Sequence, residues 1–113
     1  MSIEGLWSVD FGFAGGIAVM ETGRVYGGDS WFAYTGNYEV DRDSVSAHLR
    51  IQRHNRSSSG IDLWRSGDDM DEVDVILMLT GDQLSATGLM TEARGKSVLP
   101  VAVIMKKLSE LLG

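Results

Sequence analysis

One segment of the chain is dense in carboxylates. At the end of a stretch from Asn55 to Glu72 that fits no strand pattern, five positions hold Asp68, Asp69, Asp71 and Glu72. That many oxygens could bind Ca²⁺, but the spacing is not that of an EF-hand loop, and we predict no metal site. Two interpretations stay open: a solvated acidic loop, and a docking site that attracts and orients a basic partner. We take the four carboxylates as candidate partner-binding residues.

Residues that could support catalysis are few. The chain has no cysteine, which removes thiol nucleophiles and thiolate metal sites. Its histidines, His48 and His54, fall six residues apart on the polar side of one predicted strand, where solvated side chains are the simpler interpretation. No GxSxG, HExxH or P-loop pattern occurs. Because no spacing joins a nucleophile to a base, we predict a protein that is not an enzyme and holds no cofactor.

Aromatic and aliphatic residues form a second candidate site. Phe32, Tyr34 and Tyr38 share one face of a predicted strand. An eight-stranded barrel is just wide enough to be filled by its own side chains or to hold one small ligand. A packed core is the simpler interpretation, and a cytoplasmic binding protein or sensor for a small lipophilic ligand is the alternative. The candidate cavity residues are Phe32, Tyr34, Tyr38, Leu49, Ile51, Val75 and Leu77.

The elements that would position these residues are strands. Apolar and polar residues alternate in one short run after another. Thr22-Gly23 and Gly81-Asp82 are turn dipeptides, and Asp41-Arg42-Asp43 is a third hairpin turn. The pattern predicts an all-β fold, an eight-stranded antiparallel up-and-down barrel. The predicted strands are Ile3 to Val9, Gly16 to Met20, Arg24 to Gly27, Trp31 to Val40, Ser44 to His54, Val73 to Thr80, Leu84 to Met90 and Val98 to Met105.

Some residues interrupt the strand pattern. Gly36 and Gly88 lie inside predicted strands and indicate bulges or sharp bends that let the sheet curl. Pro100 cannot donate to a ladder, so it belongs at a strand start, a bulge or an open edge. The leucines of Leu108–Leu112 have helical spacing, which predicts a short C-terminal helix that plugs one end of the barrel.

Length and charge bound the function. The 113 residues support one domain, 1–113. Ten Lys and Arg against 16 Asp and Glu give 10 − 16 = −6, and such a surface repels phosphate, so we predict no direct nucleic-acid binding. The N-terminus lacks a basic region followed by an apolar stretch, and no apolar run approaches the roughly 20 residues that cross a bilayer. We expect a cytoplasmic protein without membrane contact.

Several motifs occur in an order that resembles a known family. Gly5-Leu6-Trp7 is similar to the G-x-W of the lipocalin and calycin barrels. The most distinctive motifs are Gly23-Arg24-Val25-Tyr26-Gly27-Gly28-Asp29 and Tyr34-Thr35-Gly36-Asn37-Tyr38. The set is completed by Gly15-Gly16-Ile17-Ala18-Val19, the strand Val45 to Arg53, Leu79-Thr80-Gly81 and Thr87-Gly88. Over most of the chain, these motifs resemble the GrlR-like family of bacterial regulators, small lipocalin-like barrels associated with control of type III secretion.

The resemblance implies a homodimer that acts by protein contact and holds a helix-turn-helix transcriptional activator away from DNA. The best-known member of the family uses a surface cluster of alternating carboxylates for this contact, and the acidic run of this chain is similar in charge. The family barrel also has an apolar cavity that can take a lipid-like molecule. We therefore predict a negative regulator that sequesters an activator. Its dimer contact is open between a strand edge, the region around Trp64, the leucines of Leu108–Leu112, and Trp31.

Overall fold

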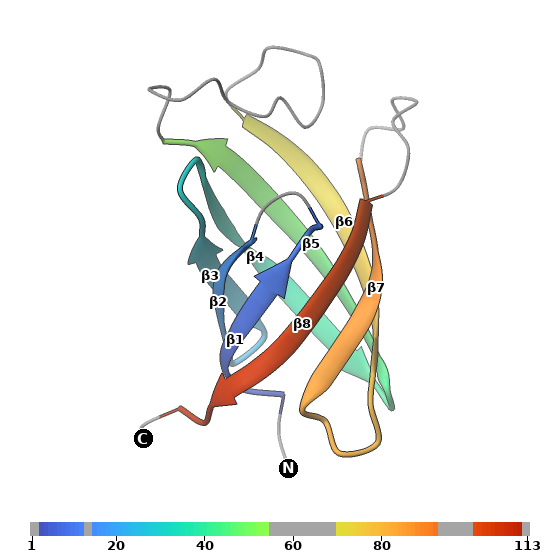
Figure 1. The fold of residues 1–113 in the computed structure, drawn as a ribbon. Helices are drawn as coiled ribbons and strands as arrows, with labels where there is room; N and C mark the ends of the chain where they lie inside the picture. The colour runs from blue at the N-terminus through green and yellow to red at the C-terminus, as the bar shows by residue number, and fades with distance from the viewer. Residues whose placement is uncertain (1–2, 13–14, 55–69, 93–100, 112–113) are drawn as a thin grey trace.

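The protein is a β-barrel, and every regular element in the part of the chain that the structure describes is a strand. The computed structural model describes residues 3–12, 15–54, 70–92 and 101–111 (Figure 1). No helix long and apolar enough to cross a membrane is found among these residues. The strands are β1 (Gly5–Asp10), β2 (Gly15–Glu21), β3 (Arg24–Gly28), β4 (Phe32–Asp41), β5 (Ser44–Arg53), β6 (Met70–Leu79), β7 (Ser85–Glu92) and β8 (Val101–Ser109).

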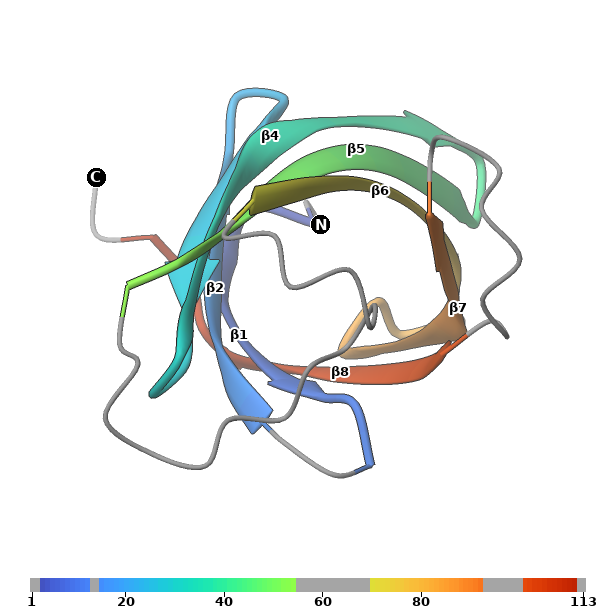
Figure 2. The ribbon, with the colours of Figure 1, turned by 90° about the horizontal axis from the view of Figure 1, so that it is seen from above.

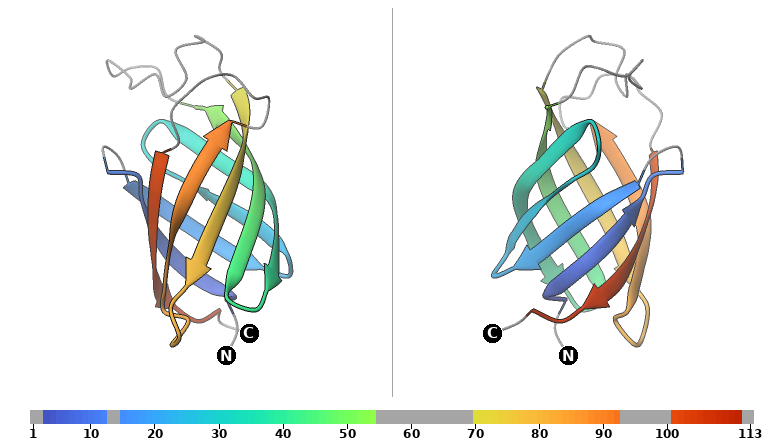
Figure 3. Two further views of the ribbon diagram at one scale, coloured as in Figure 1. Left: turned by 90° about the vertical axis from the view of Figure 1, so that its right-hand side faces the viewer. Right: turned by 60° about the vertical axis from the view of Figure 1, so that its left-hand side comes forward.

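Each strand pairs antiparallel with the next, and β8 pairs back with β1, so the sheet closes on itself. Figure 2 shows this ring from above. Figure 3 shows that the strands are inclined to the barrel axis, as closure of a small barrel requires. The prediction of an eight-stranded up-and-down barrel is confirmed, and the architecture is consistent with a lipocalin or calycin-like fold.

The predicted C-terminal helix is absent from the described residues. Leu108 instead lies in β8, which continues to Ser109 opposite Leu6 of β1. Ladder pairing with β1 closes the barrel and supplies hydrogen-bond partners that an isolated turn of helix would lack. Leu112 and Pro100 lie outside the described residues.

The predicted hairpin turns are confirmed. Thr22 and Gly23 connect β2 to β3 with φ values of 52° and 77°, as a two-residue hairpin turn with left-handed backbone requires. Arg42 has a φ of 57° in the turn from β4 to β5. Between β6 and β7, the Asp82 carboxylate accepts hydrogen bonds from the Thr80 hydroxyl and the Leu84 amide, at 2.5 and 3.0 Å.

Gly36 and Gly88 lie where neighbouring backbones come very close. The strand register is unbroken at both residues: Gly36 stands opposite Leu49 of β5, and Gly88 stands opposite Leu77 of β6. A Cβ on Gly36 would collide with the carbonyl oxygen of His48. The two glycines therefore allow neighbouring backbones to approach closely where the sheet coils, and the predicted alternative of a bulge does not apply to them.

The base of the barrel is closed by the N-terminal part of the chain. Trp7 is fully buried, and its indole N–H donates to the carbonyl of Ile3 at 2.8 Å. Lys107, opposite Trp7 on β8, has a buried side chain that pairs with Glu110 at 2.8 Å. The register of β1 against β8 shifts between Leu6 and Trp7. This end of the barrel is thus filled, and the cavity lies above it.

Candidate functional site

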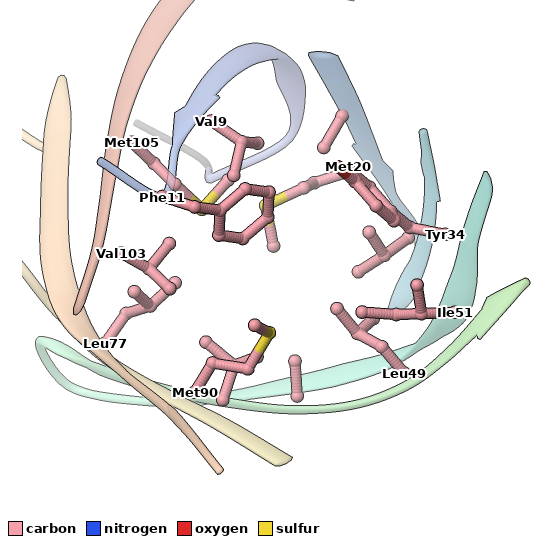
Figure 4. A pocket seen from close by; sticks show the side chains of 14 residues that line it. Val9, Phe11, Met20, Tyr34, Leu49, Ile51, Leu77, Met90, Val103 and Met105 are labelled. Atoms are coloured by element: carbon pink, nitrogen blue, oxygen red, sulfur yellow. The ribbon is translucent and has the colours of Figure 1, made fainter. Parts of the chain in front are cut away.

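The interior of the barrel contains an apolar cavity, shown in Figure 4. Five of the seven predicted cavity residues line it: Tyr34, Leu49, Ile51, Val75 and Leu77. Phe32 and Tyr38 are buried in the core, but they do not line this cavity. The other lining residues are Val9, Phe11, Ala18, Met20, Val25, Ala47, Met90, Val103 and Met105.

The cavity is small because the barrel's own side chains fill most of the interior. Its volume is about 40 Å³, a few times the space that one water needs. Phe11 points into the lumen (Figure 4), with its ring edge-on to Tyr34 at a centroid distance of 5.8 Å. Met20, Met90 and Met105 face the same space, and their unbranched side chains can change rotamer to admit a larger group.

Sequence reasoning missed several lining residues. Phe11 was left out because the first strand was predicted to end at Val9, whereas β1 reaches Asp10 and the inward alternation Trp7, Val9, Phe11 continues. That alternation was the available signal. Met20, Met90 and Met105 fall on the inward phase of predicted strands, and the same alternation would have identified them.

A hydrogen-bond network centred on Asp29 orders the connection from β3 to β4. The Asp29 carboxylate accepts from the backbone amides of Trp31 and Phe32, both at 2.8 Å, and from the Tyr34 hydroxyl. Burial, reinforced by this hydrogen bond, raises the pKa of Tyr34 far above its ordinary value. Tyr34 therefore stays protonated and serves as a fixed donor. In the sequence, Asp29 stands out only as the last residue of a motif. The pattern does not predict that its carboxylate caps the backbone amides before β4.

The end of β5 forms hydrogen bonds with the connection between β3 and β4. The His54 amide donates to the Trp31 carbonyl, and the ring Nε2 lies 2.9 Å from the Asp29 carbonyl oxygen. Beside it, the Arg53 guanidinium stacks over the Phe32 ring at 5.0 Å. Both contacts fasten β5 to the start of β4, and neither histidine lines the cavity.

His48 lies on the outer surface of the barrel, as predicted for the polar face of β5. Its Nδ1 is 2.8 Å from an Asp74 carboxylate oxygen, and its Nε2 is 3.7 Å from Glu72. The hydrogen bond that the His48 ring donates to the Asp74 carboxylate is the main cause that raises the pKa of His48. In the described part of the chain, no group of three His, Asp or Glu side chains could hold a metal ion.

The predicted acidic loop is partly strand. Asp68 and Asp69 lie outside the described residues, but β6 begins at Met70, so Asp71 and Glu72 belong to a strand opposite Ile51 and Arg50. The prediction that the loop extends to Glu72 is therefore wrong, because ladder pairing with β5 overrides the local charge density.

A second acidic cluster stands at the turn between β4 and β5. Glu39, Asp41 and Asp43 alternate along the chain, and all three are exposed. Glu39 and Asp41 fall on the outward phase of β4, opposite Ser46 and Ser44. Sequence reasoning treated this segment only as a hairpin turn, although its alternating charges were a visible signal. We call these three residues the acidic hairpin.

Comparison of the chain with known protein families finds no matching family model, and comparison with curated proteins finds no match.

Proposed function

We propose that this protein is a cytoplasmic, non-enzymatic negative regulator that binds a helix-turn-helix transcriptional activator and keeps it from DNA. The observation that carries the proposal is the combination of a nearly filled interior with carboxylates fixed on the outer surface. The cavity of about 40 Å³ leaves little room for a substrate. The acidic hairpin, in contrast, has three exposed carboxylates at the end of β4 and in the turn that follows it. A barrel built in this way acts on partners through its outside.

Electrostatics gives the proposed contact its mechanism. The DNA-binding face of an activator is basic, because it must neutralise phosphates. A chain with a net charge of −6 attracts such a face from a distance, and carboxylates on a rigid hairpin can occupy the positions that phosphates would take. The complex should therefore weaken as salt rises.

The resemblance to the GrlR-like family supports the same proposal. The motif residues that carry it have structural roles here: Trp7 closes the base, and Asp29 orders the connection after β3. A family that uses alternating surface carboxylates to hold its activator fits both the acidic hairpin and the run Asp68, Asp69, Asp71 and Glu72. The resemblance also implies a homodimer, without indicating the face through which two copies meet.

Affinity capture from the native host's lysate tests this proposal. The wild type is compared with two charge-reversal variants, one with Lys at Glu39, Asp41 and Asp43, and one with Lys at Asp68, Asp69, Asp71 and Glu72. We expect the wild type to recover a DNA-binding regulator and the hairpin variant to lose it. Loss only in the second variant would move the dock to that acidic run. If the wild type recovers no such regulator even at low salt, the proposed function is wrong.

A small lipophilic ligand is the second candidate, favoured by the wholly apolar cavity with three methionines on its wall. A bound molecule would have to displace these side chains, because the present space is below the engineered cavity of about 150 Å³ that admits benzene. Native mass spectrometry of freshly purified protein tests this candidate. A reproducible added mass that Ala47→Phe removes would support it, and the mass of the bare chain alone would count against it.

A further inference from the structure

The outer surface of the barrel is hollowed along β5. Figure 2 shows β4, β5 and β6 as neighbours in the ring, and their register places nine outward positions in three rows that we call the trough. The rows are Asp41, Ser44 and Met78; Glu39, Ser46 and Ile76; and Asn37, His48 and Asp74. Six of these residues line a hollow of about 480 Å³, against about 40 Å³ inside the barrel. The space for an occupant is therefore on the outside.

Two serines of β5 form the floor of the trough. Ser44 and Ser46 are the central residues of the first two rows, and their side chains are too short to fill the space between the longer ones on either side. In the third row His48, with its Nδ1 2.8 Å from Asp74, closes one end. The trough thus runs along β5 and is open toward the turn between β4 and β5.

The two walls of the trough differ in chemistry. The β4 wall carries the exposed carboxylates of Glu39 and Asp41, which belong to the acidic hairpin. The β6 wall carries Ile76 and Met78, which are 60% and 55% exposed. Leu89 of β7 stands opposite Ile76 and is also exposed, so the apolar wall continues onto the next strand. An occupant that complements both walls is basic on one side and apolar on the other.

We propose that the trough binds a cationic amphipathic helix of a partner protein. The proposal rests on the proposed function, and it adds the element of the partner that is held and an apolar contact that carboxylates do not provide. Two strand spacings of about 4.8 Å put the walls about 10 Å apart, and a helix with its side chains is about 10 to 12 Å across. From Ser44 to His48 the trough is about 13 Å long, which is two to three helical turns.

Other occupants do not match the trough. A nucleic acid or an anionic membrane would bring negative charge against the acidic wall of a chain whose net charge is −6. An added strand needs a free edge, and the described strands form a closed barrel. The described part of this chain contains no helix, so those residues of a second copy cannot supply the occupant. A helix of another protein, with Lys or Arg beside its apolar side, complements both walls.

Two synthetic peptides of about 18 residues and identical Leu, Lys and Ala content test the proposal. In the first peptide, leucines recur at i, i+3, i+4 and i+7 with lysines beside them, and in the second the order is shuffled. Anisotropy of the fluorescent peptides is followed as the protein is added at about 150 mM salt. We expect the amphipathic peptide to bind at least about 10-fold more tightly than the shuffled one. Equal affinities would overturn the helix as the occupant.

Single substitutions locate the contact. Glu39→Lys should weaken binding of the amphipathic peptide at least about 10-fold and reduce its salt dependence, because it reverses a charge of the acidic wall. Ile76→Ser should weaken binding about 10-fold with an unchanged salt dependence. Ser46→Trp should block the trough by filling its floor. Glu21→Lys and Ile17→Ser, matched changes at exposed residues of β2, should bind like the wild type.

Circular dichroism and the melting temperature establish that each variant is folded. Folded Glu39→Lys and Ile76→Ser variants that bind like the wild type, or β2 variants that lose as much affinity as they do, would overturn the trough. Failure of the proposed function gives a different result. If Ile76→Ser captures the activator as well as the wild type does, the function stands and the trough is wrong. If the trough binds the peptide but the wild type captures no activator, the trough stands and the function is wrong.

Discussion

The inward and outward faces of the barrel can be compared directly at two isoleucines. Ile51 lines the cavity and is 2% exposed, whereas Ile76 points outward from β6 and is 60% exposed. Replacing each by Ala removes the same three carbon atoms. The comparison therefore isolates burial from chemistry.

The expected magnitudes differ severalfold. At about 0.8 kcal/mol for each buried carbon, Ile51→Ala loses about 2.4 kcal/mol of transfer free energy. Enlarging a void that already exists adds a cavity term, because the stiff barrel wall cannot collapse into it, and the total reaches about 3 to 4 kcal/mol. Ile76→Ala should cost at most about 0.5 kcal/mol, since its side chain is largely solvated.

Urea unfolding at a low protein concentration measures both values. We expect the Ile51→Ala midpoint to fall sharply with an unchanged m value, while the Ile76→Ala midpoint stays near that of the wild type. Equal losses in the two variants, or a larger loss for Ile76→Ala, would refute the assignment of faces. A strand shifted by one residue would produce that result, because it exchanges the two faces.

Three further predictions concern single residues. Gly88→Ala should prevent folding or lower the melting temperature severely, because its Cβ would collide with the Ile76 carbonyl, while Gly81→Ala, with open space around it, should melt near the wild type. His48 should titrate above its ordinary pKa in an NMR titration. Its contribution to stability is present below about pH 6.5 and is lost as pH rises through the higher folded pKa, and Asp74→Asn should reduce both effects to the smaller part that Glu72 supplies. In an ultraviolet titration, Tyr34→Phe should leave the absorbance change near pH 10 unaltered, because the Tyr34 phenol is still protonated there; a smaller change in the variant would contradict the buried network.

The strands could be predicted because the sheet of a closed barrel has one buried and one solvated face. Apolar and polar residues therefore alternate along each strand with a period of two. The ends of strands could not be read in the same way. Met70, Asp71 and Glu72 look like an acidic loop, and only pairing with β5 makes them strand. Leu108 is separated from the next leucines by the three and four residues typical of a helix. Only pairing with β1 makes it part of β8. In both places a partner that is distant in sequence decides the local structure.

The candidate sites were predictable to different degrees. Inward alternation identified five of the fourteen residues of the cavity wall, because the same period that predicts a strand also selects its buried face. The amount of space inside was not predictable, since it depends on how Phe11 and the methionines pack. The grouping of exposed apolar side chains on β6, β7 and β8 also required the structure. Ile76, Leu89 and Ile104 are far apart in sequence, and register alone brings them together.

The central claim is that this barrel removes an activator from its DNA, and competition for that DNA tests it most directly. The captured regulator is bound to a fluorescent duplex carrying its site, and the anisotropy is followed as the wild-type barrel is added. We predict a fall to the value of free DNA, less complete at higher salt and absent with Lys at Glu39, Asp41 and Asp43. Anisotropy that stays at the bound value, or rises because the barrel joins the complex on DNA, would contradict the account.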